Sequence, residues 1–324
     1  MKGRKFSPTE IIFASTNACN LHCEHCFIER NPHKLEISNA ISFLKNCVQN
    51  AGKTDSNGDT LPTIEKIGFS GGEPFLYMDF LLEVTKTAIS HDLMFDQIMT
   101  NGDWWRDEAD LCDKLKTLYD AGYDGKIGLS WDSYHGQSTE RMETFIRTVQ
   151  EIFGKDSINI QTVDNQGALR GAEPPVEGVE SNEVRTRGRL PPSKLIEKIS
   201  VYHLPRTYTS DDPRAWQERR WFSEDYCEGP GHILYIHADG NIAPCCGFAN
   251  ENPALFIGRI TDSIETIMQN ASKNQLIKIC YEEGLSHFRR HGLKKYLRLL
   301  HKKLPGKTAD ICTFCDYVCK TLKN

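Results

Sequence analysis

Two kinds of hydrophobic pattern alternate over the first 165 residues. Short apolar runs with strand character are separated by segments in which apolar residues recur every three to four positions, as expected of helices. Strands that alternate with helices of roughly 10–15 residues predict βαβ units and a parallel sheet. The expected strands lie at 10–16, 66–70, 95–102, 126–133 and 158–163, with a sixth near 196–204.

The pattern changes after residue 164. Residues 164–192 are rich in glycine, proline and charge, which predicts a long loop leaving the carboxyl edge of the sheet, and ordered loops of this length are often functional. Beyond residue 224, alternating apolar residues around 239–241 predict a β-hairpin, and helical patterns follow. We therefore expect an α/β domain at 1–220 and a smaller domain at 221–324.

Composition narrows the classes of partner. The 324 residues carry a net charge of −5, whereas general nucleic-acid binders are usually basic. The N-terminal residues lack the apolar core and cleavage site of a signal peptide, and no apolar run approaches the ~20 residues of a membrane span. The expectation is a cytoplasmic protein whose partners include neither nucleic acid nor a membrane.

Twelve cysteines are unevenly spread along the chain. In a reducing compartment disulfides are rare, so clustered cysteines indicate metal or iron–sulfur ligands. Three cysteines lie at 19–26, three at 227–246 and three at 312–319. The others, Cys47, Cys112 and Cys280, stand alone within helical patterns and are expected to be small buried hydrophobic residues.

The first cysteine group has the spacing C-x3-C-x2-C, formed by Cys19, Cys23 and Cys26 directly after the first expected strand. Open α/β sheets place their sites at the carboxyl ends of such strands. Thiolates bind iron–sulfur clusters as well as zinc, and three of them leave one coordination position open. A zinc site completed by His22 or His25 remains the alternative.

A second motif, Gly71-Gly72-Glu73-Pro74, ends the second expected strand. Glycines let the backbone approach a ligand closely, and a carboxylate at this edge could bind an ammonium group. The alternative is an ordinary turn at the end of a strand.

In this order and on these elements, the two motifs resemble the radical S-adenosylmethionine (SAM) superfamily. The resemblance implies a partial (βα)6 barrel and a [4Fe–4S] cluster held by Cys19, Cys23 and Cys26. It further implies that the amino and carboxylate groups of SAM chelate the open iron. One departure is His25, because the residue before the third cysteine of this family is commonly aromatic.

The same resemblance implies further contacts. Asn101 and Ser130, at the ends of the third and fourth strands, match positions that contact SAM, and Arg141 matches an arginine that pairs with the SAM carboxylate in some members. Asp132 and His135 point from the same edge and could face substrate. The alternatives are a solvated helix charge for Arg141, and helix capping and loop packing for the other two.

The later cysteines resemble the auxiliary-cluster extensions of this superfamily, known as SPASM and twitch. Cys227 is followed by Gly240-x4-Cys245 and then by Cys312-x2-Cys315, which matches the one-cluster form best. The ligands implied for an auxiliary [4Fe–4S] cluster are Cys227, Cys245, Cys312 and Cys315. Cys319 either replaces one of them or packs, and a structural zinc site remains the alternative.

Cys246 directly follows one of these implied ligands. Adjacent residues cannot easily ligate the same cluster, so Cys246 is expected to point elsewhere while staying near it, and a thiol beside a redox centre suits hydrogen-atom donation. Much of the chain resembles epipeptide-type radical SAM peptide epimerases, in which the second cysteine of a Pro-Cys-Cys hairpin is the hydrogen donor. The segments that carry this resemblance are GGEPFLY, TNGDWW, SWDSYH, DGNIAPCC and the C-terminal C-x2-C.

The implied function is reductive cleavage of SAM to a 5′-deoxyadenosyl radical, which abstracts a Cα hydrogen from a ribosomally synthesised precursor peptide and leads to an L-to-D conversion. An external electron donor such as flavodoxin or ferredoxin is implied as well. Three alternatives stay open: a radical SAM dehydrogenase or a peptide cross-linking enzyme, either using the auxiliary cluster as electron acceptor, and a zinc-stabilised binding protein. A role for Cys246 as a small buried residue is also open.

Overall fold

The computed structural model describes residues 3–164, 196, 199–228, 231–301 and 303–322. Apart from Asp164, the loop expected at 164–192 lies outside the described residues. The chain forms two compact units, one of residues 14–34 and 67–206 and the other of residues 1–13, 35–66 and 207–324. The domain boundary expected near residue 220 stays a prediction.

The first unit is built on a sheet of five strands. Their order is β2 (Lys66–Ser70), β3 (Met94–Thr100), β4 (Lys126–Ser130), β5 (Ile158–Asp164) and β6 (Ser200–Pro205). The strands from β3 to β6 pair in parallel, and the register brings the carboxyl ends of β5 and β6 level at the pair Asp164 and Pro205. The predicted parallel sheet is therefore confirmed, and so is its sixth strand near residues 196–204.

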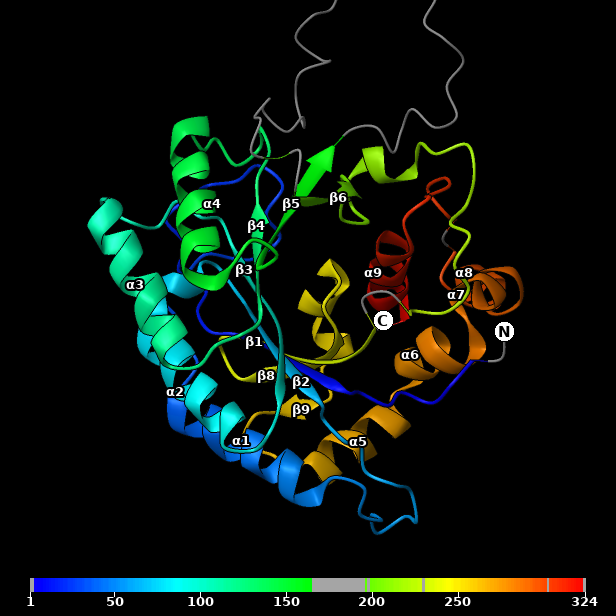
Figure 1. Ribbon diagram of the computed structural model, residues 1–324. Coiled ribbons are helices and arrows are strands. Elements are labelled where there is room, and N and C mark those ends of the chain that lie inside the picture. The colour runs from blue at the N-terminus through cyan, green and yellow to red at the C-terminus, as the bar shows by residue number, and fades with distance from the viewer. Residues whose placement is uncertain (1–2, 165–195, 197–198, 229–230, 302, 323–324) are drawn as a thin grey trace, which may run out of the picture. The chain divides into compact units, whose positions relative to one another are not determined.

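Three amphipathic helices of this unit lie next to one another along its sheet, namely α2 (Met78–Ile89), α3 (Glu108–Asp120) and α4 (Thr139–Phe153) (Figure 1). Asp107 caps α3 by accepting a hydrogen bond from the Asp110 backbone N–H, and Ser138 caps α4 in the same way. The face of α4 predicted to be apolar is buried, with Phe145 and Val149 fully shielded from solvent. The loops that join strands to helices are thereby fixed at the carboxyl edge.

The second unit carries the predicted hairpin. Strands β7 (Gly231–Ile236) and β8 (Asn241–Cys245) are antiparallel, and Gly240 adopts φ +84° in the turn between them, a conformation that favours glycine. The short strand β9 (Gly258–Arg259) pairs with β8. On its other side β7 pairs in parallel with β1 (Glu10–Ala14), which the sequence pattern did not predict.

Helices complete the second unit. Helix α1 (Ile37–Asn50) packs on α5 (Ile264–Lys273), and the Asn46 side chain accepts a hydrogen bond from the Ile264 backbone N–H at 2.8 Å. The helical pattern expected at 261–304 is broken into short pieces, with Gly284 at φ +88° ending one of them. The pieces are α6 (Gln275–Lys278), a π-helical turn (Ile279–Glu283), α7 (Leu285–His287), a second π-helical turn (Phe288–Gly292) and α8 (Leu293–Leu299). Helix α9 (Ile311–Leu322) follows, and short 3-10 helices occupy Pro74–Tyr77, Pro213–Trp216, Phe248–Glu251 and Pro253–Leu255.

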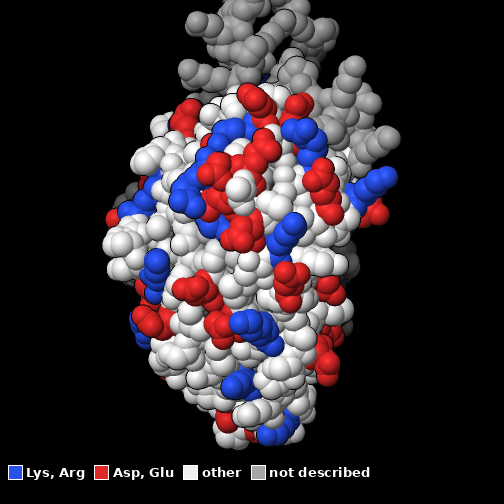
Figure 2. Space-filling model, turned by 60° about the vertical axis from the view of Figure 1, so that its left-hand side comes forward, with Lys and Arg blue, Asp and Glu red and all other residues white. Residues whose placement is uncertain are grey.

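The described surface is mixed in charge. On the face drawn in Figure 2, basic and acidic side chains are interspersed. Within the described ranges, every helix is too short or too polar to cross a membrane.

Candidate functional site

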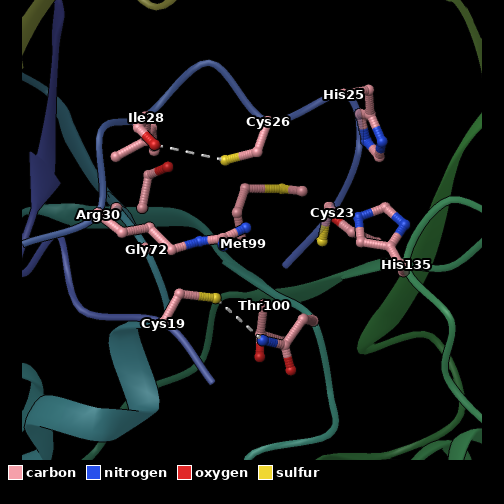
Figure 3. A pocket seen from close by; sticks show the side chains of 14 residues that line it. Cys19, Cys23, His25, Cys26, Ile28, Arg30, Gly72, Met99, Thr100 and His135 are labelled. Carbon is pink, nitrogen blue, oxygen red and sulfur yellow. Dashed lines mark hydrogen bonds between the residues drawn. The ribbon is translucent and has the colours of Figure 1, made fainter. Parts of the chain in front are cut away.

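A cavity opens at the carboxyl ends of the strands in the first unit (Figure 3). Its wall contains all three cysteines of the C-x3-C-x2-C motif, which lie in the loop after β1. Other residues of the cysteine loop, the last residues of β2, β3 and β4, and the segments after these strands line the remainder. Of the residues predicted to bind SAM or face substrate, the cavity is lined by Gly71, Gly72, Asn101, Ser130 and His135.

The glycine turn and the cysteine loop are joined through their backbones. The N–H of Gly72 donates to the Thr16 carbonyl at 2.7 Å, and the N–H of Glu73 donates to the Ala18 carbonyl at 2.8 Å. A β-carbon at Gly72 would lie 2.3 Å from the Ala18 carbonyl oxygen, and one at Gly71 would lie 2.4 Å from that of Thr16. Only glycine fits these positions, so the two motifs require each other.

Cys19 and Cys23 lie in an environment that disfavours their free thiolates. Burial raises the pKa of Cys19, and burial together with the neighbouring Cys26 and Cys19 raises the pKa of Cys23 to about 12. The Asn101 side-chain amide donates to the Cys19 sulfur at 3.7 Å and to the Asn20 side chain at 2.9 Å. Deprotonation of Cys19 and Cys23 is therefore favoured by a positive partner such as iron.

The Glu73 side chain points from the glycine turn into the protein interior. Its carboxylate is fully buried and accepts hydrogen bonds from the Thr100 hydroxyl at 2.8 Å and from the backbone N–H groups of Asn101 at 2.8 Å and Phe75 at 3.1 Å. Burial raises its pKa to about 7 in spite of these donors. The carboxylate thus fixes the end of β3, and its role toward an ammonium group stays a prediction. Pro74, also buried, begins the 3-10 turn that follows.

Arg141 is held by neighbouring residues of the protein. The guanidinium of Arg141 donates to the Asp103 carboxylate and to the Trp105 carbonyl at 2.6 Å, and it stacks on the Trp105 ring. Arg141 is not among the residues that line the cavity, so its pairing with SAM stays a prediction.

Arg30 was not singled out in the sequence, yet it reaches from the end of the cysteine loop into the cavity (Figure 3). Among the described residues its Nε is buried and lacks a hydrogen-bond partner. The available signal was its place four residues after Cys26.

Asp132 and His135 form a hydrogen-bonded pair behind the cavity. The Asp132 carboxylate lies 2.8 Å from His135 Nδ1 and accepts backbone N–H groups of Tyr134 and Val163, both at 2.9 Å. Although burial alone would raise it, the pKa of Asp132 is lowered, mainly by the hydrogen bond from His135. His25 packs edge-on against the His135 ring, and burial lowers the pKa of His25 to about 4. Asp132 therefore orients His135, which itself borders the cavity.

A second group of cysteines lies in the other unit. Cys227 and Cys245, on either side of the hairpin, and Cys315, on α9, are each buried. Burial, followed by the neighbouring Cys315, raises the pKa of Cys227 to about 12, and burial followed by the neighbouring Cys227 and Cys315 raises that of Cys245. Cys312, one turn before Cys315, has its pKa raised mainly by burial and then by Asp310 and Cys227. The four ligands implied by the sequence are thus brought together.

Two more cysteines join this group. Cys280 Sγ lies 3.7 Å from Cys315 Sγ, so the expectation that Cys280 stands alone is wrong, although it is buried as expected. Cys319, also buried, contacts the Cys315 sulfur from the next turn of α9. Cys280 was missed because its neighbours are 35 or more residues away in sequence.

The spacing of donor atoms bears on the zinc alternative. Within the described ranges, His25, Asp132 and His135 are the one group of three or more His, Cys, Asp or Glu side chains placed closely enough to share a single ion. The cysteines of the second group do not form such a group, whereas a tetrahedral zinc ion would hold four thiolates at about 2.3 Å.

Comparison with known proteins bears on both cysteine groups. A family model described as SPASM, an iron–sulfur cluster-binding domain, matches residues 227–316, from the first cysteine of the second group to the residue after Cys315. Residues 227–316 therefore match a SPASM domain, and this match supports the resemblance of the chain to radical SAM proteins that carry one. The fold fits the predicted radical SAM barrel followed by an auxiliary-cluster domain. Cys319 lies outside the SPASM match.

Relatives of this chain include a Bacillus subtilis (strain 168) protein described as putative peptide biosynthesis protein YydG. It is 21% identical over 308 residues, which cover 92% of this chain and 88% of that protein. Two crystal structures of SuiB from Streptococcus suis, one bound to its precursor peptide SuiA and one to S-adenosylmethionine, are each 14% identical and cover 95% of this chain. They cover 76% and 75% of the SuiB chain, with TM-scores of 0.46 and 0.43.

The cofactors of a radical SAM protein fit the residues present. Cys19, Cys23 and Cys26 offer three sulfurs to one cavity, and the buried Nε of Arg30 offers an unused donor at its wall. The SPASM domain offers four further thiols in its interior. SAM and [4Fe–4S] clusters are therefore the cofactors of this chain.

Proposed function

We propose that this radical SAM enzyme acts on a ribosomally synthesised peptide and converts one residue from the L to the D configuration at Cα. The description of its Bacillus subtilis relative as a putative peptide biosynthesis protein supports the class of substrate. The observation that carries the epimerase assignment is the exposure of Cys246. It is the exposed member of the second cysteine group, directly after the buried Cys245.

The position of Cys246 follows from local structure. Strand β8 ends at Cys245, whose side chain points inward, and the chain bends at Cys246. The thiol stays close to the group, because it is one of the neighbours that raise the pKa of Cys227 and Cys245. A thiol that is open to solvent on one side and close to a redox centre on the other can meet a substrate radical and then be restored.

The residues of the barrel unit have distinct proposed tasks. Cys19, Cys23 and Cys26 hold the cluster, and the backbone of Gly71–Pro74, with Asn101 and Ser130, holds SAM. When bound, this cofactor pair supplies the 5′-deoxyadenosyl radical that removes a hydrogen atom from substrate. Asp132 keeps His135 oriented at the cavity wall, where its ring can position the peptide.

The proposed return step balances in atoms and electrons. Loss of the Cα hydrogen atom leaves a planar carbon radical, and the S–H bond of Cys246 breaks to form the new Cα–H bond on the other face. Cys246 is left as a thiyl radical, which needs one electron and one proton to become a thiol again. We assign the electron to the auxiliary cluster and, beyond it, to an external donor such as flavodoxin or ferredoxin.

The test compares Cys246→Ala with the intact enzyme on its precursor peptide. The variant should still form 5′-deoxyadenosine but give no D-residue, and the intact enzyme in deuterated water should place one deuterium at the epimerised Cα. Chiral amino-acid analysis detects the D-residue, and mass spectrometry detects the deuterium. Normal epimerisation by the variant would contradict the donor assignment, and a product lighter by two hydrogens would favour a dehydrogenase or a cross-linking enzyme.

A further inference from the structure

Cys280 contacts two members of the proposed auxiliary ligand set. It lies in the π-helical turn Ile279–Glu283, and 5% of its surface is exposed. Its sulfur is 3.7 Å from the Cys315 sulfur, and its carbonyl accepts a hydrogen bond from the Cys227 backbone N–H at 3.0 Å. A main-chain contact thus holds Cys280 beside Cys227, and its thiol contacts Cys315.

Cys280 cannot serve as a fifth ligand of the same cluster. A [4Fe–4S] cluster held by four cysteines takes one thiolate at each iron, and the proposed set of Cys227, Cys245, Cys312 and Cys315 fills these positions. Ligand sulfurs point outward from different corners of the cluster, so they lie farther apart than two sulfurs in hydrogen-bonding contact. The contact between Cys280 and Cys315 fits a ligand and a neighbouring donor.

The direction of the hydrogen bond follows from the chemistry of a ligand. Cysteine binds iron as the thiolate, which carries no proton and can only accept. Cys280 has no iron to bind and keeps its S–H. We propose that Cys280 donates an S–H hydrogen bond to the thiolate of Cys315 and so tunes the reduction potential of the auxiliary cluster.

The sign of the effect follows from charge. Reduction adds a negative charge to the cluster and its sulfurs, and a hydrogen bond to a ligand sulfur stabilises that added charge. The bond from Cys280 therefore raises the potential, and its loss shifts the potential to more negative values. Cys280 is in this sense a positioning residue for electron transfer, and the inference rests on the proposed ligand set.

The experiment measures the midpoint potential of the auxiliary cluster in the full-length chain. The substitutions Cys19→Ala, Cys23→Ala and Cys26→Ala are introduced throughout, so that only the auxiliary signal remains. Cys280→Ala and Cys280→Ser are then compared by redox titration followed by electron paramagnetic resonance, together with iron and sulfide analysis. Cys47→Ala is the matched control, because Cys47 is a fully buried cysteine on α1 outside the cysteine group.

The expected result is a retained cluster in all three variants. The potential should shift negatively in Cys280→Ala, and should stay near that of the parent in Cys280→Ser, whose hydroxyl still donates, and in Cys47→Ala. An unmoved potential in Cys280→Ala, or an equal shift in Cys47→Ala, would overturn the proposal. Loss of cluster iron in Cys280→Ala would overturn it too, because Cys280 would then be a ligand.

A separate variant tests the ligand set itself. Cys315→Ala should lose the auxiliary cluster, with its iron and its resonance signal. If Cys315→Ala keeps a normal cluster, the ligand assignment has failed, whatever the potential of Cys280→Ala shows. The epimerase proposal is tested separately, by the peptide product of Cys246→Ala. Failure of that proposal can therefore be distinguished from failure of the Cys280 proposal.

Discussion

The two cysteine groups of this chain differ in how exposed their cysteines are. In the loop after β1, Cys19 and Cys23 are half-buried and Cys26 is exposed, at a cavity that a small molecule can enter. In the SPASM domain, Cys227, Cys245 and Cys315 are buried. An open coordination position belongs to catalysis and a closed one to structure or electron transfer. Under the proposed function, bond cleavage belongs to the first group and electron supply to the second.

The largest expected effect separates the tasks of the two groups. Cys23→Ala should abolish 5′-deoxyadenosine formation and remove the iron of one cluster, while the auxiliary cluster stays, because the SPASM ligands do not depend on this loop. Chromatography of SAM products and iron analysis measure both outcomes. Cys112→Ala, a half-buried cysteine of α3, is the matched control. Loss of all iron in Cys23→Ala would contradict the view that the two cysteine groups bind their clusters independently.

A smaller effect concerns the charges around the open site. Arg30→Met should weaken SAM binding by roughly 10- to 100-fold, because a hydrogen bond to a charged group contributes about 1.5–3 kcal/mol. Arg141→Met should change affinity by less than roughly threefold, because its guanidinium is already engaged by Asp103 and Trp105. Equilibrium dialysis with the reconstituted enzyme measures both constants. If Arg141→Met weakens SAM binding more than Arg30→Met does, Arg141 would instead be assigned to the SAM carboxylate.

Another expected effect concerns Glu73 under the glycine turn. Its folded-state pKa of about 7 lies above the ordinary carboxyl value of 4.5, so the native chain binds this proton more tightly than the unfolded chain. The resulting stability is fully present below pH 4.5 and is lost as pH rises toward 7. A shift of this size is on the order of 3 kcal/mol.

Glu73→Gln tests that expectation in the cofactor-free protein. In this variant, a glutamine amide replaces the carboxylate that accepts hydrogen bonds from the surrounding donors. The substitution therefore lowers the free energy of unfolding by an amount that does not vary with pH. The difference in unfolding free energy between the variant and the parent, measured by urea denaturation, should therefore shrink between pH 4.5 and 7. If the difference in unfolding free energy does not change with pH, Glu73 does not bind a proton in this range.

The sequence was sufficient wherever a local pattern determines the structure. Alternating strand and helix periods predicted six parallel strands, and the Asp239-Gly240 turn signal predicted the hairpin. The cysteine and glycine motifs also pointed to one cavity, because parallel strands bring their carboxyl ends together. Close contacts between the backbones at Gly72 and Ala18 explain why these motifs need their particular residues.

Sequence reasoning failed where distant segments decide the role of a side chain. Cys280 reads as a solitary helical cysteine until the fold places Cys315 beside it. Arg141 matches an arginine that pairs with SAM in some family members, which stays a prediction, but its contact with the Asp103 carboxylate was not visible in the sequence. Arg30 has no periodic signal at all, since only the shape of the loop directs it into the cavity.

The pairing of β1 with β7 has a consequence for how the chain is made. Gly231, the first residue of β7, leaves the ribosome long after Glu10, the first residue of β1. At 5–20 residues per second, the edge of β1 that pairs with β7 waits roughly 10–45 s for its partner. Throughout that interval an apolar strand offers unpaired backbone groups to any other extended chain. Protection of the nascent N-terminus by a ribosome-associated chaperone is therefore expected to govern the yield of folded protein.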